Sequence, residues 1–145
     1  MKRTLIGMMF LAAALSSCKR TGQGTLAVPA VVMGSLQTGD TTLQDGSVAD
    51  DHTVWLTAGT PVTVVVRGGP STSTPGSNLD VYTIMMFNNQ EVAHDDDGAG
   101  NLNSRLIYTP TQTGMHTVRV TTYGSGLKTG TYTVQTYAGA NPAAT

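Results

Sequence analysis

The sequence predicts an all-β protein, an antiparallel β-sandwich of about eight short strands with jelly-roll-like connections. Charged residues make up 12% of the 145 residues, whereas Thr, Ser and Gly are abundant. Runs of β-branched residues such as 62–66 recur, and branched side chains suit a pleated surface. Beyond the N-terminal leader, no segment keeps a helical period over ten residues. The length suits one domain.

The first 17 residues have the three parts of a secretory signal: Lys2 and Arg3, an apolar core over 5–15, and two small residues. The core is shorter than the roughly 20 residues that span a bilayer. The next residue is Cys18, the only cysteine in the chain, so no internal disulfide can form. The run Leu15-Ser16-Ser17-Cys18 resembles the lipobox of bacterial lipoproteins.

That resemblance implies cleavage before Cys18, diacylation of its sulfur with fatty acids such as palmitate, and acylation of the new N-terminus. Two or three acyl chains anchor a protein firmly, because each buried methylene contributes about 0.8 kcal/mol. Lys19 follows the cysteine, where the inner-membrane retention signal of Gram-negative lipoproteins has Asp. We therefore expect an exported protein anchored in the bacterial outer membrane.

The formal net charge is −1, and it becomes −3, six basic against nine acidic residues, once Lys2 and Arg3 are removed. No basic field is available to attract nucleic acid, so a nucleic-acid partner is not expected.

Four parts follow along the chain: the signal peptide 1–17, the lipidated cysteine and a flexible spacer 18–29, a β-sandwich 30–138, and a disordered tail 139–145. Turn signals separate the predicted strands, of which the run 60–67 is the strongest. In the stretch 50–59, alternation directs His52, Val54 and Leu56 to one face and Thr53 and Trp55 to the other. Gly68-Gly69-Pro70 should end the strand before it, and Asn88-Asn89 fits a hairpin turn. The predicted strands are 30–36, 50–58, 60–67, 80–87, 91–94, 104–108, 115–122 and 131–137.

The order of these motifs is similar to the bacterial pre-peptidase C-terminal domain, a β-sandwich usually appended to secreted proteases and related to collagen-binding domains. The matching pieces are 34–36, 50–59, 63–66, 79–82, 95–97 with 104–108, 114–120 and 130–134. The resemblance implies a non-catalytic module. Two departures are His52 and His116, which stand where the family commonly has an aromatic residue such as Tyr. We also expect the module to stand alone, without a preceding protease.

The stretch 94–105 gathers three of the nine acidic residues with two asparagines, and calcium prefers six to eight such oxygen ligands. This stretch is a candidate calcium site, and calcium is the one cofactor that the sequence suggests. The alternative is a sharp structural loop whose side chains bond backbone amides, with Arg105 neutralising one carboxylate. The candidate calcium ligands are Asp80, Asp95, Asp96, Asp97, Asn101 and Asn103.

Aromatic side chains offer binding area at low entropic cost, and Trp55, Tyr82 and Tyr123 are the candidates for ligand binding. His52, His94 and His116 lack the close spacing of a zinc site. No Gly-x-Ser-x-Gly elbow or paired-carboxylate arrangement identifies catalytic residues, so we expect no enzyme.

The sequence thus predicts a lipid-anchored, non-catalytic binding module of the cell envelope that recognises protein or polysaccharide. One alternative is an accessory envelope subunit that docks to a partner protein, and a more remote one is a hydrolase.

Overall fold

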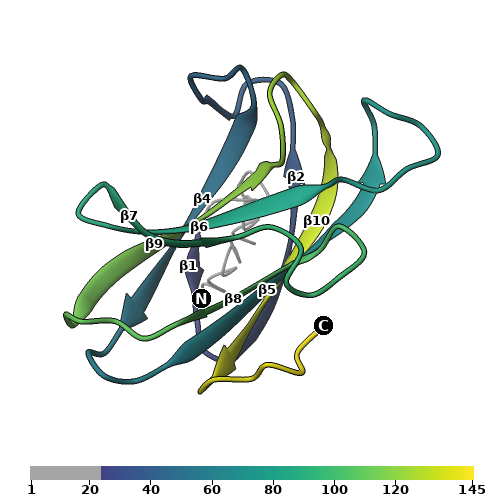
Figure 1. Ribbon diagram of the computed structural model, residues 1–145. Coiled ribbons are helices and arrows are strands. Elements are labelled where there is room, and N and C mark those ends of the chain that lie inside the picture. The colour runs from purple at the N-terminus through teal and green to yellow at the C-terminus, as the bar shows by residue number, and fades with distance from the viewer. Residues whose placement is uncertain (1–23) are drawn as a thin grey trace, which may run out of the picture.

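The chain forms two β-sheets packed face to face in the computed structural model, which describes residues 24–145 (Figure 1). Sheet A has the strand order β1-β4-β9-β6-β7, with β3 paired to β4, and sheet B has the order β2-β10-β5-β8. All pairs are antiparallel except β1 with β4. The strands are β1 Thr25–Leu26, β2 Ala30–Leu36, β3 Thr41–Thr42, β4 Val48–Leu56, β5 Val62–Ser71, β6 Val81–Phe87, β7 Gln90–Asp95, β8 Ser104–Tyr108, β9 Gly114–Thr122 and β10 Gly130–Ala138.

The all-β sandwich is confirmed, and each predicted strand corresponds to one of the eight longer strands. The alternation in β4 is also confirmed: His52, Val54 and Leu56 are buried between the sheets, whereas Trp55 is 61% exposed on the outer face of sheet A. Asn88 and Asn89 have φ angles of 51° and 61° and close the β6–β7 hairpin, the geometry that a two-residue hairpin turn requires.

The core lies between the two sheets and receives apolar side chains from both. Sheet A contributes Val54, Met85 and Val118, and sheet B contributes Val64 and Val134, each at most 1% exposed. Burying such a side chain stabilises the fold by about 1.5 to 3 kcal/mol. The sandwich is therefore held mainly by this apolar layer.

Strand β5 is longer than predicted, since it continues through Gly68-Gly69-Pro70 to Ser71. Neighbouring segments of the same chain explain why glycines occupy these positions. A Cβ on Gly68 would lie 1.9 Å from the carbonyl oxygen of Leu79, and a Cβ on Gly69 would lie 2.3 Å from Oγ1 of Thr131. Glycine at these positions permits close packing of β5 rather than ending it.

The N-terminal boundary of the domain also differs from the expectation. Residues 24–29 were predicted as spacer, but Thr25–Leu26 form β1 beside β4, and the amide of Thr53 donates to the carbonyl of Gly24 at 2.9 Å. The signal peptide 1–17 and Cys18 lie outside the described residues. Within residues 24–145, no helix is long and apolar enough to cross a membrane.

The last residues pack against the outer face of sheet B, although the sequence predicted a disordered tail over 139–145. Thr63 Oγ1 donates to the carbonyl of Gly139 at 2.8 Å and accepts from the amide of Asn141 at 2.8 Å. Arg105 donates to the carbonyl of Ala144 at 3.1 Å, and Ala144 is only 5% exposed. Polar groups on the sheet surface thus give the tail partners that its own sequence does not reveal.

Candidate metal and ligand site

The acidic loop connects β7 in sheet A to β8 in sheet B. Its turn is closed by backbone hydrogen bonds from Gly100 to the carbonyl of Asp97 at 2.7 Å and from Asn103 to the carbonyl of Gly100 at 3.0 Å. Gly100, Asn101 and Leu102 have positive φ angles of 76°, 53° and 64°. Glycine and asparagine adopt this conformation at low cost, which explains two of the three residues.

Two of the predicted calcium ligands accept hydrogen bonds from backbone amides instead. Oδ2 of Asp95 accepts from the amides of Gly98 at 2.9 Å and Arg105 at 2.7 Å. Oδ1 of Asn103 accepts from the amide of Gly68 at 3.1 Å, which ties the loop to β5. These contacts match the structural alternative, in which side chains of a sharp loop bond main-chain amides.

Three other predicted ligands, Asp80, Asp96 and Asp97, come together. One carboxylate oxygen of each lies within 4.8 Å of the other two. Oδ1 of Asp80 and Oδ1 of Asp96 are buried and accept no hydrogen bond, although buried polar atoms usually have a partner. An all-oxygen donor set with unsatisfied acceptors fits a hard cation such as Ca²⁺. Asn101, the last predicted ligand, is exposed on the loop.

The electrostatics of this acidic cluster, defined as Asp80, Asp96 and Asp97, are unfavourable for three negative charges. Burial raises the pKa of Asp80, and Asp97 raises it further, while Lys128 opposes the rise. Burial also raises the pKa of Asp96, with contributions from Asp97 and Asp80. A bound divalent cation would reverse these effects, because it favours the charged carboxylates.

Arg105 does not neutralise the loop through its side chain. Its backbone amide donates to Asp95, and its guanidinium donates to the carbonyl of Ala144. Among residues 24–145, Asp51 forms an ion pair with Arg119 and Glu91 is hydrogen-bonded to His94, and neither contact includes the acidic cluster. Lys128, whose Nζ donates to the carbonyl of Tyr123, supplies the nearby positive charge.

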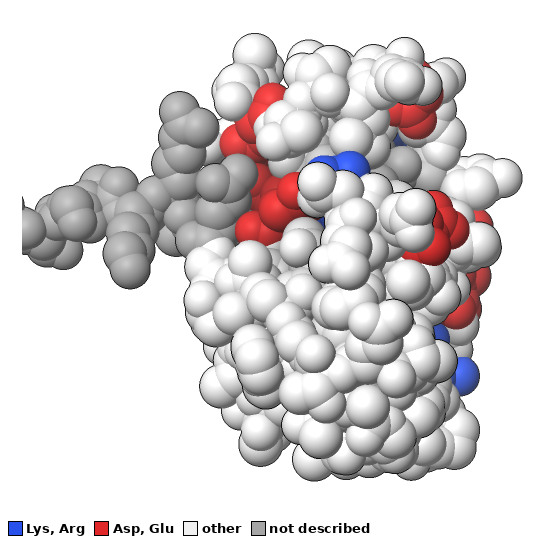
Figure 2. Space-filling view, turned by 90° about the vertical axis from the view of Figure 1, so that its left-hand side faces the viewer, with Lys and Arg blue, Asp and Glu red and all other residues white. Residues whose placement is uncertain are grey.

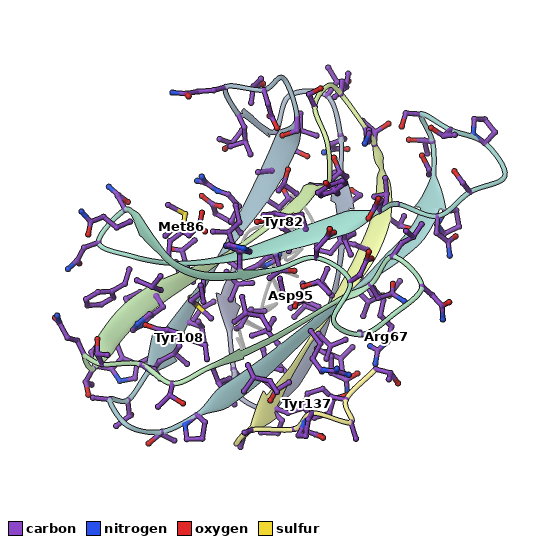
Figure 3. The ribbon with its side chains drawn as sticks, in the orientation of Figure 1. Arg67, Tyr82, Met86, Asp95, Tyr108 and Tyr137 are labelled. Carbon is purple, nitrogen blue, oxygen red and sulfur yellow. The ribbon has the colours of Figure 1, made fainter. Side chains whose placement is uncertain are left out.

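Two of the three predicted ligand-binding aromatics lie beside this cluster. The rings of Tyr82 and Tyr123 are 6.4 Å apart, and His94 stacks on Tyr82 at 5.5 Å. Tyr123 is 54% exposed, and its amide donates to the carbonyl of Asp80 at 2.9 Å. Figure 3 shows Tyr82 in the upper half of the sandwich and Tyr108 and Tyr137 in the lower half.

Trp55 belongs to a different part of the surface. It pairs with Met115 on β9, whereas Tyr82 pairs with Thr121, six residues further along the same strand. Six strand residues span about 20 Å. The structure therefore separates Trp55 from the Tyr82 and Tyr123 pair.

Sequence reasoning missed a buried polar chain in the sandwich. The hydroxyl of Tyr132 donates to Oδ2 of Asp50 at 2.7 Å and bonds Nε2 of His52 at 2.8 Å, and all three residues are at most 2% exposed. Burial raises the pKa of Asp50 to about 6, and burial lowers the pKa of His52. The available signal was that Asp50 and His52 share the inward face of one strand.

The three histidines occupy three separate environments. His52 is bonded to Tyr132, and His94 is exposed beside Glu91. His116 is buried. Its Nδ1 donates to the carbonyl of Gly114 at 3.0 Å, and its ring stacks on Phe87 at 4.4 Å. At the two positions where the family commonly has an aromatic residue, the imidazole rings thus pack against aromatic rings.

Comparison with known proteins supports a family assignment. Residues 48–122, just over half of the chain, match the bacterial pre-peptidase C-terminal domain. No curated protein matches the chain.

Two solved structures share the fold. The pre-peptidase C-terminal domain of collagenase from Bacillus anthracis has a TM-score of 0.54 and 14% identity, over 79% of this chain and 93% of that one. PliG from Aeromonas hydrophila, a periplasmic inhibitor of g-type lysozyme, has a TM-score of 0.54 and 12% identity, over 80% of this chain and 95% of that one. Together with the two-sheet topology, the match over 48–122 shows that this chain belongs to the bacterial pre-peptidase C-terminal domain family.

Proposed function

We propose that this protein is a lipid-anchored, non-catalytic binding module of the cell envelope, which is stabilised by calcium and holds a protein or polysaccharide ligand. The family is a non-catalytic domain type, which fits a binding or accessory role. The observation that carries the proposal is the acidic cluster beside the half-buried Tyr82 and the exposed Tyr123. Calcium would bind Asp80, Asp96 and Asp97, and the two rings would contact the ligand.

The acidic cluster and the two tyrosines suit ligand binding better than catalysis. Calcium at the cluster would neutralise three carboxylates and fix the loop between β7 and β8. The adjoining tyrosines present apolar faces and polar hydroxyls, a combination that serves both peptide and sugar recognition. Two solved structures that share the fold are a collagenase domain and a lysozyme inhibitor, and a similar accessory role in contact with another macromolecule is what we propose here.

Calcium binding is tested by thermal unfolding. A ligand present at 100 times its Kd stabilises the folded state by about 2.7 kcal/mol, so millimolar calcium should raise the Tm measured in chelator. Asp96→Asn removes one ligand charge and should abolish the rise. Glu91→Gln, on β7 but outside the acidic cluster, is the matched control and should retain it. An unchanged wild-type Tm between chelator and calcium would remove calcium from the proposal.

Ligand binding is tested by pull-down from the native envelope with the full protein, with and without chelator. Tyr82→Ala and Tyr123→Ala should each weaken the capture of polysaccharide or protein, whereas Tyr137→Ala on the outer face of sheet B should not. Capture that neither tyrosine substitution affects would contradict the proposed site. A single partner protein that remains bound to both variants would instead favour the accessory subunit.

A further inference from the structure

Charge is distributed unevenly between the two ends of the sandwich. The stretches 53–66 and 106–118 contain no Asp, Glu, Lys or Arg. They include the β4–β5 and β8–β9 connections, which are joined by hydrogen bonds from Gly59 to the carbonyl of Pro110 and from Ala58 to Oγ1 of Thr113, each 2.9 Å. In Figure 2, much of the lower part of the visible face is free of charged side chains. We call these two stretches the uncharged end.

The uncharged end exposes large apolar side chains. Trp55 is 61% exposed and its strand partner Met115 is 48% exposed, side by side on the outer face of sheet A. Beside Trp55 lies a hollow of about 230 Å³ whose lining is mostly apolar and includes Val28 and Pro61. Contiguous apolar patches on the surface of a soluble protein mark sites of contact with a protein or a membrane.

The first described residue, Gly24, lies near this end. Gly24 is hydrogen-bonded to Thr53, and Trp55 is two residues further along β4, or about 7 Å. Cys18 precedes Gly24 by six positions, and six extended residues reach at most about 20 Å. An acylated Cys18 would therefore hold the domain within reach of the bilayer, with room for the uncharged end to turn toward it.

Charge favours the same orientation. Residues 24–145 carry four basic and nine acidic side chains, a net charge of −5. Anionic headgroups repel the acidic end, whereas the uncharged end meets no such repulsion. Lys19 and Arg20 directly follow Cys18, and basic residues next to an anchor are attracted to anionic lipids. Trp and Met can bury their apolar surface at the headgroup boundary.

We propose that the uncharged end, with the exposed Trp55 and Met115, is a membrane-docking surface that rests on the phospholipid bilayer holding the anchor. The inference depends on the proposed lipidation of Cys18. It orients the domain so that the Tyr82 and Tyr123 site, about 20 Å further along the sheet, faces away from the bilayer. A ligand could then reach that site without crossing the membrane surface.

Trp55 is the only tryptophan in the chain, so its fluorescence tests the inference directly. The full lipidated protein is reconstituted in vesicles of phosphatidylethanolamine and phosphatidylglycerol, with bromine atoms on the acyl carbons nearest the headgroups. We expect emission at shorter wavelength than that of Cys18→Ser protein in buffer, and strong quenching by bromine. The matched control is Trp55→Phe with Tyr123→Trp, whose reporter lies at the acidic end and should not be quenched by bromine.

The outcomes separate the two proposals. Vesicle-bound wild-type protein whose Trp55 is quenched by aqueous acrylamide as fully as in buffer, and not by bromine, would overturn the docking surface and leave the anchor intact. Failure of the wild-type protein to float with vesicles would overturn both. A Trp55 emission of the Cys18→Ser protein that shifts with protein concentration would overturn membrane docking in favour of a second copy of the chain.

Discussion

At the scale of single residues, Asp50 is the least expected feature of the core. Its carboxyl group is 2% exposed, and Tyr132, from the opposite sheet, donates its hydroxyl proton to it. Because that proton is used, Nε2 of His52 supplies the proton in its own bond to Tyr132, and Nδ1 of His52 is buried without a partner. Buried polar chains of this kind depend on every member being satisfied. The protonation state of Asp50 should therefore affect the stability of the fold.

The first prediction concerns the pH dependence of this group. Burial raises the pKa of Asp50 from 3.8 to about 6, so the folded state holds a proton that the unfolded chain has released. This contribution to stability is fully present below about pH 4 and is lost as pH rises through 6. The difference is at most about 3 kcal/mol, from about 1.4 kcal/mol for each pKa unit.

Asp50→Asn measures this contribution, because the amide imitates the neutral acid at every pH. The variant should gain stability relative to wild type above pH 6 and lose that advantage near pH 4, as measured by urea unfolding across this range. His52, whose lowered pKa acts in the opposite direction, is present in both proteins and cancels in the difference. A stability difference that does not change with pH would show that the Asp50 pKa is ordinary in the folded state.

Strand elements show what local sequence could and could not reveal. The alternation in β4 depends only on neighbouring residues, so His52, Val54 and Leu56 were correctly assigned to the core. The bond from Tyr132 to Asp50 joins residues 82 positions apart. It depends on the relative placement of two sheets, which no local pattern contains. The same reason explains why the packed tail over 139–144 was missed.

The candidate site was predictable to a similar extent. The oxygen-rich composition of the loop identified its residues, and Asp80 was among the candidate ligands. Composition could not separate Asp95, which accepts two backbone amides, from Asp96 and Asp97, which face Asp80. That division depends on the direction of each side chain, which only the three-dimensional structure shows.

Strand β5 provides the prediction at this scale. Gly68 approaches the backbone of Leu79 so closely that a methyl group would displace the segment before β6. Gly68→Ala should therefore lower the free energy of unfolding by about 1 to 3 kcal/mol, the usual cost of overpacking. Gly24→Ala is the control, since a Cβ at that position meets no atom within 4 Å. Equal denaturation midpoints for the two variants would show that β5 and the Leu79 segment move apart at little cost.

For the whole molecule, the two ends of the sandwich have different chemistry. The acidic cluster and the tyrosine pair lie toward one end of sheet A, and Trp55 with Met115 lies at the other. A freely diffusing domain gains nothing from this separation. A domain fixed to a surface does, because one end can face the bilayer while the other remains open to a ligand. The proposed attachment at Cys18 is therefore the feature on which the orientation of the molecule depends.

Cys18→Ser tests that attachment in cells. Without the sulfur no diacyl chain can be added, and the loss of about 0.8 kcal/mol for each buried methylene should shift the protein from the membrane fraction to the soluble fraction. Ser17→Ala keeps a small residue before the cysteine and should leave the protein in the membrane fraction. Labelling with a fatty acid analogue separates lipid attachment from other causes of membrane retention. Cys18→Ser protein that still incorporates the label and stays with membranes would contradict lipidation at this residue, and with it the orientation derived from the two ends of the sandwich.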